Sequence, residues 1–258
     1  MVRRIAIEAG EITLKYLEEI DDIHVDIKND DSPVTLADRE AETFIQMSLE
    51  ELTPNIPIIG EEAAALGKLP DLQDAEYFWI VDPLDGTKEY IAGGGDYTVN
   101  IALVRSHEPI MGVVYAPYHG HLYAGHGEGT AVKWVEDTNK EKPIQVRDVP
   151  PSGMTVVASK SHGDAEKRDK FLEAFKVEKL VKRGSSLKIC IIAEGKADIY
   201  PRFGPTCEWD TAAGDAVLRA AGGVMAEVNG DILKYGGFKP KFLNPEFIAC
   251  SYRWFETS

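Results

Sequence analysis

Apolar residues near the start of the chain recur with the period of an α-helix. They stand three or four positions apart in two stretches, so each stretch can bury one face. We expect the first helix to begin at about Val2. We expect the second to follow Thr35 and to end at about Leu52, because one proline stands just before it and another just after it.

Shorter apolar runs, separated by turn residues, predict the strands of the first half. They span residues 77–81, 98–104, 110–115, 121–125 and 130–135. The second and third of these strands are expected to form a hairpin around Ser106–Pro109. The first half is therefore predicted to contain a largely antiparallel sheet with helices against it.

The second half alternates between the two periods. Strands at 154–158, 178–181 and 197–200 alternate with helices at 165–175, 187–193 and 211–221, and short strands close the chain. This alternation predicts a layered α/β arrangement. The polar segment Asp137–Pro151 contains three prolines, and we expect it to separate an α+β half, residues 1–150, from an α/β half, residues 151–258.

Composition narrows the classes of partner. The 258 residues carry a net charge of −15, and 44% of them are apolar. The negative charge argues against binding a nucleic acid polymer. It leaves room for a small phosphorylated ligand, because a bound metal ion can reverse the local potential.

Three cysteines lie far apart and form neither a CxxC site nor a disulfide framework. The N-terminus has the pattern of an amphipathic helix and not of a signal peptide. No apolar run approaches the ~18 residues of a membrane span. We expect a cytoplasmic protein; loose attachment to the inner face of a membrane stays open.

Two acidic residues close together give the strongest indication of chemistry. Asp82 and Asp85 stand at the end of an apolar run and are followed by a Gly–Thr pair. Carboxylates this close repel each other unless a cation lies between them. Mg²⁺ takes oxygen ligands and keeps positions for substrate phosphate. A turn alone needs only one acid and a glycine, so a metal-assisted phosphate site is the favoured interpretation.

The residues around this pair suit such a site. The proline after Asp82 favours an extended conformation there, so that Asp85 can come around a turn to face the same point, with the Leu84 carbonyl beside it. Gly86 permits close approach of the backbone. Thr87 adds a hydroxyl that can orient a water, and a helix beginning there would offer N–H groups to a phosphate oxygen.

Other acidic residues could join this pair, and each has an alternative explanation. Glu61 and Glu62 follow an apolar run and could form only an exposed loop face. Asp210 precedes a predicted helix and could serve only as its N-cap. Asp38 follows Thr35 by three positions, as in a capping box with Asp in place of Glu.

Two stretches resemble the signatures of one enzyme superfamily. Asp82–Thr87 and Trp209–Gly214 are similar to the two signatures of the lithium-sensitive, Mg²⁺-dependent phosphatases, which include inositol monophosphatase and fructose-1,6-bisphosphatase. Gly60-Glu61-Glu62 stands upstream at the matching distance. The resemblance covers nearly the whole chain and implies a mixed α/β fold, a layered αβαβα sandwich, and inhibition by Li⁺.

Within this superfamily the chain is most similar to the bacterial 3′(2′),5′-bisphosphate nucleotidases. The stretches that carry this similarity are Asp31–Asp38, Asp82–Ile91, Tyr97–Leu103, Gly112–Pro117, Ser159–His162, Gly184–Lys188 and Tyr200–Thr206. The loop Gly93–Gly95 departs from the family, which has a more polar, basic loop here. We interpret these glycines as a flexible connection and not as a nucleotide P-loop, since no Lys-Ser/Thr follows them.

The resemblance implies roles for the acidic residues. Two Mg²⁺ ions, or three during turnover, would be held by Glu61, Asp82, Asp85 and Asp210 with the Leu84 carbonyl. Most of these ligands belong to the N-terminal half, and Asp210 belongs to the C-terminal half with the nucleotide contacts.

Further residues are assigned by the same resemblance. Asp38 would hydrogen-bond Thr87, and this pair would hold and help to deprotonate the attacking water. Glu62 would lie behind the direct ligand Glu61, and Lys28 would lie near the metals. The Gly86 and Thr87 amides would bind the transferring phosphoryl group.

The nucleotide would meet the second half of the chain. The implied contacts are His162, Ser185, Lys188 and Arg202. Taken alone, Ser185 could be a helix cap, Lys188 part of a solvated helix face and His162 part of a surface loop.

The implied activity is hydrolysis of adenosine 3′,5′-bisphosphate to AMP and phosphate, in sulfur assimilation or nucleotide recycling. The alternatives are an inositol monophosphate phosphatase and a non-catalytic module that senses a nucleotide or Mg²⁺. The protein could be a monomer or a homodimer. His119, His121 and His126 cluster around a predicted hairpin; an exposed turn is favoured over a zinc site, because no fourth ligand is evident.

Overall fold

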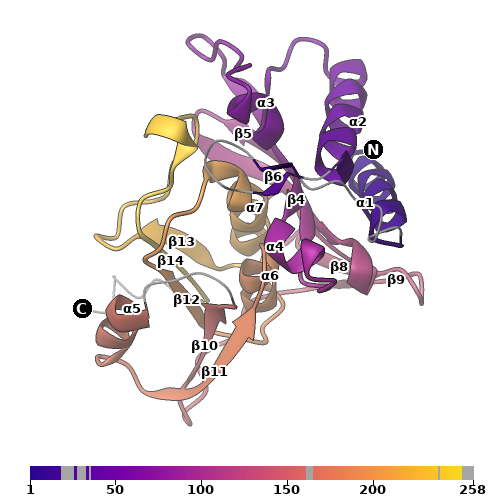
Figure 1. Cartoon of the computed structure of the whole chain (residues 1–258). Coiled ribbons are helices and arrows are strands. Elements are labelled where there is room, and N and C mark those ends of the chain that lie inside the picture. Colours follow the sequence, from indigo (N-terminus) through magenta and orange to yellow (C-terminus); the bar gives the residue numbers. More distant parts are fainter. Residues whose placement is uncertain (19–25, 28–32, 35, 161–164, 238, 252–258) are drawn as a thin grey trace.

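The computed structural model describes residues 1–18, 26–27, 33–34, 36–160, 165–237 and 239–251 (Figure 1). Its α-helices are α1 (Val2–Glu18), α2 (Leu36–Leu52), α3 (Glu61–Ala65), α4 (Thr87–Ile91), α5 (Ala165–Leu172), α6 (Leu187–Ala193) and α7 (Ala212–Ala220). Three 3₁₀ turns are η2 (Pro117–His119), η3 (Glu208–Asp210) and η4 (Pro240–Phe242).

The strands form two large sheets and one short pair. The short pair is β1 (Asp26–Ile27) with β2 (Pro33–Val34). The seven-stranded sheet contains β3 (Ile58–Gly60), β4 (Tyr77–Asp85), β5 (Thr98–Arg105), β6 (Glu108–Ala116), β7 (His121–Gly125), β8 (Val132–Val135) and β9 (Lys140–Pro143). The five-stranded sheet contains β10 (Met154–Ser159), β11 (Val177–Arg183), β12 (Ile199–Arg202), β13 (Val224–Glu227) and β14 (Phe247–Cys250).

The seven-stranded sheet follows the order of the chain from β3 to β9, and every pair except the parallel β3–β4 is antiparallel. Both faces of its centre are buried, which explains the unbroken apolar run in β4. Trp79 and Val81 pack with apolar residues of α1 and α2, whereas Phe78 and Ile80 face the opposite way into the central core. The strand that leads to the candidate acids is therefore fixed on both sides.

The central core lies between the two large sheets and contains α6 and α7 (Figure 1). Val217 of α7, Val114 of the seven-stranded sheet and Met225 of the five-stranded sheet belong to the same apolar core. Gly112 lets α7 approach β6 closely, because a Cβ there would lie 2.2 Å from the carbonyl oxygen of Ala213. This contact sets the position of the α7 N-terminus and of Asp210 just before it.

The five-stranded sheet has the order β11-β10-β12-β14-β13 and mixed direction. Its outer face packs against α5, and Leu172, Val156 and Ile248 belong to one apolar cluster there. The layers are thus helices, sheet, helices, sheet and helix, which confirms the predicted αβαβα sandwich (Figure 1). The seven-stranded sheet ends before residue 150, and the five-stranded sheet begins after it. The two sheets share the central core, however, and the division into two halves stays a prediction.

Several boundaries differ from the prediction. The predicted polar boundary segment contains a strand, β9, whose residues are all exposed at the sheet edge, so alternation of burial could not reveal it. The strand β4 does not end at Val81 but continues through Asp85, since β5 pairs with it there. The helices α3 and α4 have five residues each and are too short for a period to be visible.

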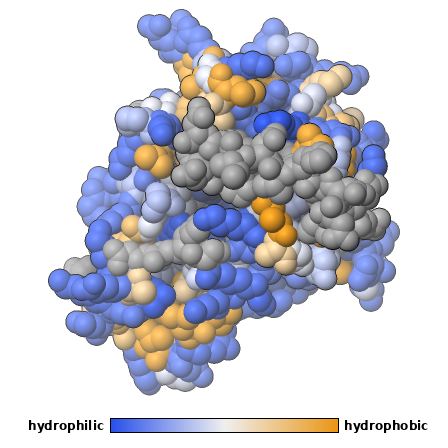
Figure 2. Space-filling view, viewed as in Figure 1, coloured by the Kyte–Doolittle hydropathy of each residue, from blue (hydrophilic) through white to orange (hydrophobic). Residues whose placement is uncertain are grey.

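The face of the molecule seen in Figure 2 is mainly hydrophilic. A hydrophobic area lies over its lower part, where β10 and β11 lie in Figure 1, and Val177 and Leu180 of β11 are both about 40% exposed. Within the described residues, none of the helices combines the length and the apolar character that crossing a bilayer requires.

The tight contact at Gly112 can be tested by Gly112→Ala. The added methyl group would meet a backbone carbonyl and the Cβ of Ala216 at 2.8 Å, so we expect unfolding free energy to fall by about 2 kcal/mol. Urea unfolding measures this. Ile110→Ala, at a site on the same strand that is 38% exposed, is the control and should cost less than about 1 kcal/mol. Equal losses in the two variants would contradict the close-packing argument.

Candidate active site

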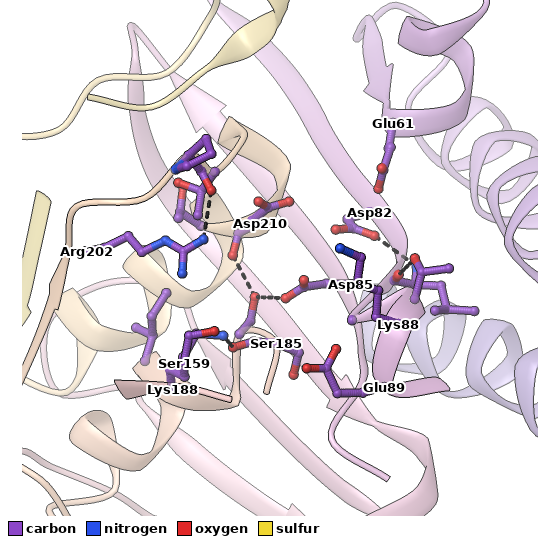
Figure 3. A pocket seen from close by; sticks show the side chains of 18 of the residues that line it. Glu61, Asp82, Asp85, Lys88, Glu89, Ser159, Ser185, Lys188, Arg202 and Asp210 are labelled. Atoms are coloured by element: carbon purple, nitrogen blue, oxygen red, sulfur yellow. Dashed lines mark hydrogen bonds between the residues drawn. The ribbon is translucent and has the colours of Figure 1, made fainter. Parts of the chain in front are cut away.

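One cavity of about 220 Å³ brings the predicted residues of both halves together (Figure 3). It is lined by Asp38, Glu61, Asp82, Leu84, Asp85, Gly86, Thr87, Lys88, Glu89, Ser159, Ser185, Ser186, Lys188, Ile189, Tyr200, Arg202, Pro205, Thr206, Asp210, Thr211 and Phe247. The end of β4, the start of α6 and the start of α7 meet here. Lys28 and His162 lie outside the described residues.

A β-bulge places Asp82 and Asp85 together. Asp82 pairs with Asn100 and Asp85 pairs with Thr98, so three steps along β4 match two along β5. Side chains three apart on a regular strand point to opposite faces, and the one extra residue returns both acids to one face. We expected a turn after a strand end; the structure corrects this to a bulge within the strand.

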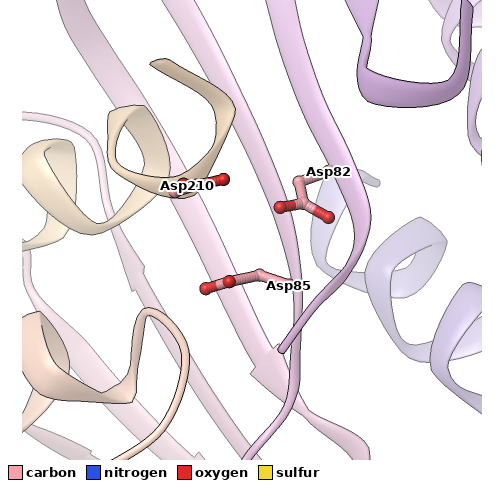
Figure 4. Close-up of side chains that lie close together, drawn as sticks. All are labelled: Asp82, Asp85 and Asp210. Carbon is pink, nitrogen blue, oxygen red and sulfur yellow. The ribbon is translucent and has the colours of Figure 1, made fainter. Parts of the chain in front are cut away.

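Asp82, Asp85 and Asp210 point toward one another (Figure 4). One oxygen from each lies within 4.8 Å of the others. Within the described chain, no group hydrogen-bonds the buried Oδ2 of Asp82, while its Oδ1 accepts from the Leu84 N–H at 2.9 Å. These three carboxylates lie close together, and one of their oxygens has no hydrogen-bond partner among the described residues. Such a donor set fits a hard divalent cation.

The pKa values of Asp82 and Asp210 are also consistent with a cation site. Burial, followed by the charges of Glu61, Asp85, Asp210 and Asp38, raises the pKa of Asp82. Burial and the charge of Asp85 raise the pKa of Asp210 to about 7. Charged carboxylates are therefore costly here without a cation to balance them.

Glu61 lines the same cavity from the start of α3, but it is not part of the close group of three aspartates. The carboxylate of Glu42 accepts hydrogen bonds from the N–H groups of Glu62 and Ala63, both at 2.8 Å, and so caps α3. Gly60 makes this possible, because a Cβ there would lie 2.6–2.7 Å from that carboxylate. Glu62 is buried and is not among the lining residues.

Glu42 is a residue that the sequence interpretation missed. It stands four positions after Asp38 on α2, and both are buried. Two acids at this spacing repel each other on an exposed helix face. That pattern was a usable signal that this face of α2 serves the site.

The loop after the bulge has the predicted form. Gly86 has φ of 94°, a left-handed conformation, and α4 begins at Thr87. The Thr87 hydroxyl donates to the Leu84 carbonyl at 3.2 Å. Asp38 lines the same cavity, and its predicted hydrogen bond to Thr87 stays a prediction.

Asp210 is not the N-cap of α7. The cap position is Thr211, and the Asp210 carboxylate instead accepts the Cys207 N–H at 2.9 Å. The backbone carbonyl of Asp210 accepts the Ser186 hydroxyl at 2.7 Å, and Ser186 also lies 3.0 Å from Asp85. Residues from η3, α6 and β4 are therefore tied together at one point.

Asn100 completes this network and was not singled out from the sequence. Its Nδ2 donates to the Ser186 Oγ at 2.9 Å. Because Asn100 supplies a hydrogen there, the Ser186 hydroxyl must direct its own hydrogen toward Asp85 or the Asp210 carbonyl. Asn100 lies directly opposite Asp82 on β5, and only this pairing reveals its position.

Basic side chains face the acids across the cavity. Figure 3 shows Arg202 and Lys188 on one side and Glu61 and Asp82 on the other. Arg202 is 5% exposed and donates to the carbonyls of Gly204 and Pro205 at 3.1 and 2.7 Å. Lys188 Nζ lies 5.7 Å from the centre of the Tyr200 ring, so Lys188 does not belong to a solvated helix face.

Ser185 and the histidines at positions 119, 121 and 126 were also singled out from the sequence. The Ser185 Oγ makes a long contact, 3.4 Å, with the Leu187 N–H, and the serine lines the cavity. The rings of His119 and His121 stack with centroids 6.0 Å apart. The part of the chain that the structure describes contains one group of acids, cysteines or histidines arranged for a metal, and His126 and its neighbours are not in it.

The arrangement separates two chemical tasks. Acids at one end suit divalent cations, and the Lys188 and Arg202 cations at the other suit an anion. A ligand with a phosphate at each end would match both.

Comparisons with known proteins agree with this arrangement. A model of the inositol monophosphatase family matches residues 2–257. The chain is 44% identical over 251 residues to the 3′(2′),5′-bisphosphate nucleotidase CysQ of Escherichia coli O6:H1, which covers 97% of this chain and 98% of that protein.

Two solved structures have the same fold. CysQ from Bacteroides thetaiotaomicron, a bacterial member of the inositol monophosphatase family, has a TM-score of 0.78 and 38% identity, with 96% of this chain and 95% of that chain covered. The inositol monophosphatase from Anabaena (Nostoc) has a TM-score of 0.74 and 26% identity, with 99% and 90% covered.

Burial of Asp210 leads to a pH prediction for the metal-free protein. Its folded pKa of about 7 exceeds the unfolded value of about 3.9. Between these values the folded state binds a proton that the unfolded state does not bind. Stability is therefore lost as pH rises from about 4 to 7.

We expect Asp210→Asn in EDTA to be more stable than wild type at pH 8 and close to it at pH 4. Thermal unfolding at the two pH values measures this. Glu208, whose pKa burial also raises to about 7, is present in both proteins and cancels in the comparison. A variant less stable than wild type at pH 8 would contradict the repulsion.

Proposed function

Because the chain belongs to the inositol monophosphatase family, we propose that it is a 3′(2′),5′-bisphosphate nucleotidase that hydrolyses adenosine 3′,5′-bisphosphate to AMP and phosphate. The family assignment confirms the resemblance found in the sequence. Two observations support this substrate: the 44% identity to CysQ over nearly the full length, and the cations Lys188 and Arg202 opposite the acids. The place in sulfur assimilation or nucleotide recycling follows from this substrate.

The acids hold the cofactor in this proposal. Asp82, Asp85 and Asp210 would bind Mg²⁺ with Glu61 and the Leu84 carbonyl, and this set offers enough oxygen atoms for two ions. Bound Mg²⁺ would supply Lewis-acid chemistry: it lowers the pKa of water and balances charge on the phosphoryl oxygens. A third ion during turnover stays an alternative.

Asp38 and Thr87 act on the attacking water. Both line the cavity next to the acids, where a water could approach the phosphorus. Thr87 would orient the water with its hydroxyl, and Asp38 would take up its proton through Thr87. Gly86 and Thr87 line the same space, and their N–H groups would stabilise charge on the transferring phosphoryl group.

The cations hold the far end of the nucleotide. The Arg202 guanidinium donates to two carbonyls, which hold it in a set orientation. Lys188 adds a point charge, and Ser185 adds a hydroxyl. His162, which lies outside the described residues, is part of the same proposal. These groups would bind the 5′-phosphate and exclude substrates without one.

The substrate proposal is tested by phosphate release with Mg²⁺. We expect adenosine 3′,5′-bisphosphate to be hydrolysed with a kcat/KM more than about tenfold above that for inositol monophosphate, because only the nucleotide reaches the cations. A tenfold preference for inositol monophosphate would replace this proposal by the alternative. Nucleotide binding without hydrolysis would favour a sensing module.

The water-activating pair is tested by Thr87→Ala and Asp38→Asn. We expect each to lower kcat by a factor of about 10² or more, since general base catalysis contributes this much. Nucleotide binding in Mg²⁺, measured by calorimetry, should persist. Thr43→Ala, at an exposed threonine of α2, is the matched control and should leave kcat unchanged. Unchanged turnover in both variants would refute the assigned role.

A further inference from the structure

Asp96 lies directly behind the wall of the cavity. It follows the three glycines at 93–95, between α4 and β5, and it is 5% exposed. It is not among the residues that line the cavity. Nothing in the chemistry above uses this buried carboxylate.

The Asp96 carboxylate joins three elements that are distant in sequence. Its Oδ2 accepts from the Gly184 N–H at 3.0 Å and from the Lys160 Nζ at 2.5 Å. Its Oδ1 lies 3.3 Å from the His119 Nε2. Two of these partners, Gly184 and Lys160, belong to the C-terminal half of the chain. The Asp96 side chain therefore links the N-terminal half to the C-terminal half.

The two C-terminal partners, Lys160 and Gly184, each come directly after a strand of the five-stranded sheet. Lys160 follows β10 and Gly184 follows β11, and these strands are parallel with Ser159 opposite Arg183. The residues next to the partners, Ser159 and Ser185, line the cavity on the side of Lys188 (Figure 3). Asp96 therefore contacts the two segments that place Ser159 and Ser185 on this side of the cavity.

The backbone of Asp96 is packed as closely as its side chain. A Cβ at Gly184 would lie 2.6 Å from the Asp96 carbonyl oxygen, and a Cβ at Gly86 would lie 2.9 Å from it. Gly86 belongs to the loop of the acids and Gly184 to the entry of α6. Ser185 has φ of 48°, a strained conformation for serine that the surroundings must maintain.

We propose that Asp96 is a positioning residue that fixes the spacing between the acid side of the cavity and its nucleotide side. This proposal rests on the proposed function, in which one substrate spans both sides. Loss of the Asp96 charge would release Lys160 and loosen Gly184 and Ser185, while Asp82, Asp85 and their metal remain in place. Contacts to the far end of the substrate are the same in the ground and transition states, so their loss raises KM and not kcat.

The first experiment compares Asp96→Asn with Glu194→Gln. Glu194 is an equally buried carboxylate at the other end of α6, where it pairs with Lys133, Lys142 and Lys196 away from the cavity. We expect Asp96→Asn to raise KM about tenfold with kcat changed less than about threefold, as for the loss of a charge-assisted hydrogen bond. Glu194→Gln should lower stability and leave KM within about twofold. Equal rises of KM in both variants would overturn the proposal.

Amide hydrogen exchange gives a readout that needs no substrate. Asp96→Asn should speed exchange of residues 184–188, because the Gly184 N–H loses its charged acceptor. Glu194→Gln should not change these amides. Mg²⁺ binding, followed by the shift in thermal unfolding, should be the same in Asp96→Asn and wild type. Unchanged exchange at 184–188 would overturn the proposal even if the wild type hydrolyses no nucleotide.

Lys160→Met separates an indirect effect from direct contact with substrate. The Lys160 side chain is 44% exposed, so its removal should leave the fold intact. We expect Lys160→Met to raise KM in the wild type and to add nothing in the D96N background, since both act through one pair. An equal rise in both backgrounds would show that Lys160 acts on the substrate itself, and would contradict the role of Asp96. A wild type that hydrolyses no bisphosphate would refute the proposed function instead.

Discussion

The repulsion among three clustered carboxylates, of which Asp82 is fully buried, is the constraint on which the rest of this structure depends. Asp82, Asp85 and Asp210 come from both halves of the chain and bring their oxygens within 4.8 Å of one another. Burial raises the cost of each charge, and the Asp82 Oδ2 has no hydrogen-bond donor within the described residues. A bound divalent cation would offset this cost. In the proposed function, part of the stability of the fold is therefore given up for metal binding.

The surrounding fold supplies the rigidity that this arrangement requires. β4 is packed on both faces, and its bulge turns two acids to one side. The close contact of Gly112 with α7 sets the position of Asp210 from the opposite direction. Ser186 and Asn100 then join the three segments by hydrogen bonds. Each of these interactions joins different elements, so the geometry of the site depends on the packing of the central core between the two sheets.

Sequence patterns revealed most of the layers and the main acids, because both depend on local order. The periods of α1 and α2 and the prolines around α2 placed the start of α1 and both ends of α2 correctly. The bulge was missed because it exists only in the pairing of β4 with β5. Lys188 alone suggested a solvated face, and its true place depends on Tyr200 and Arg202, which lie on the same side of the cavity. The close packing of Gly95, where a Cβ would lie 2.2 Å from the Tyr118 ring, was also not visible in the sequence, and the flexible connection expected at the glycines stays a prediction.

The measurement that tests the central claim most directly is anomalous diffraction from crystals soaked in Mn²⁺ as a substitute for Mg²⁺. The account predicts a peak between the two halves, with carboxylate oxygens of Asp82, Asp85 and Asp210 about 2 Å away. Crystals in which saturating Mn²⁺ leaves this point empty, with the three carboxylates turned away from one another, would contradict it.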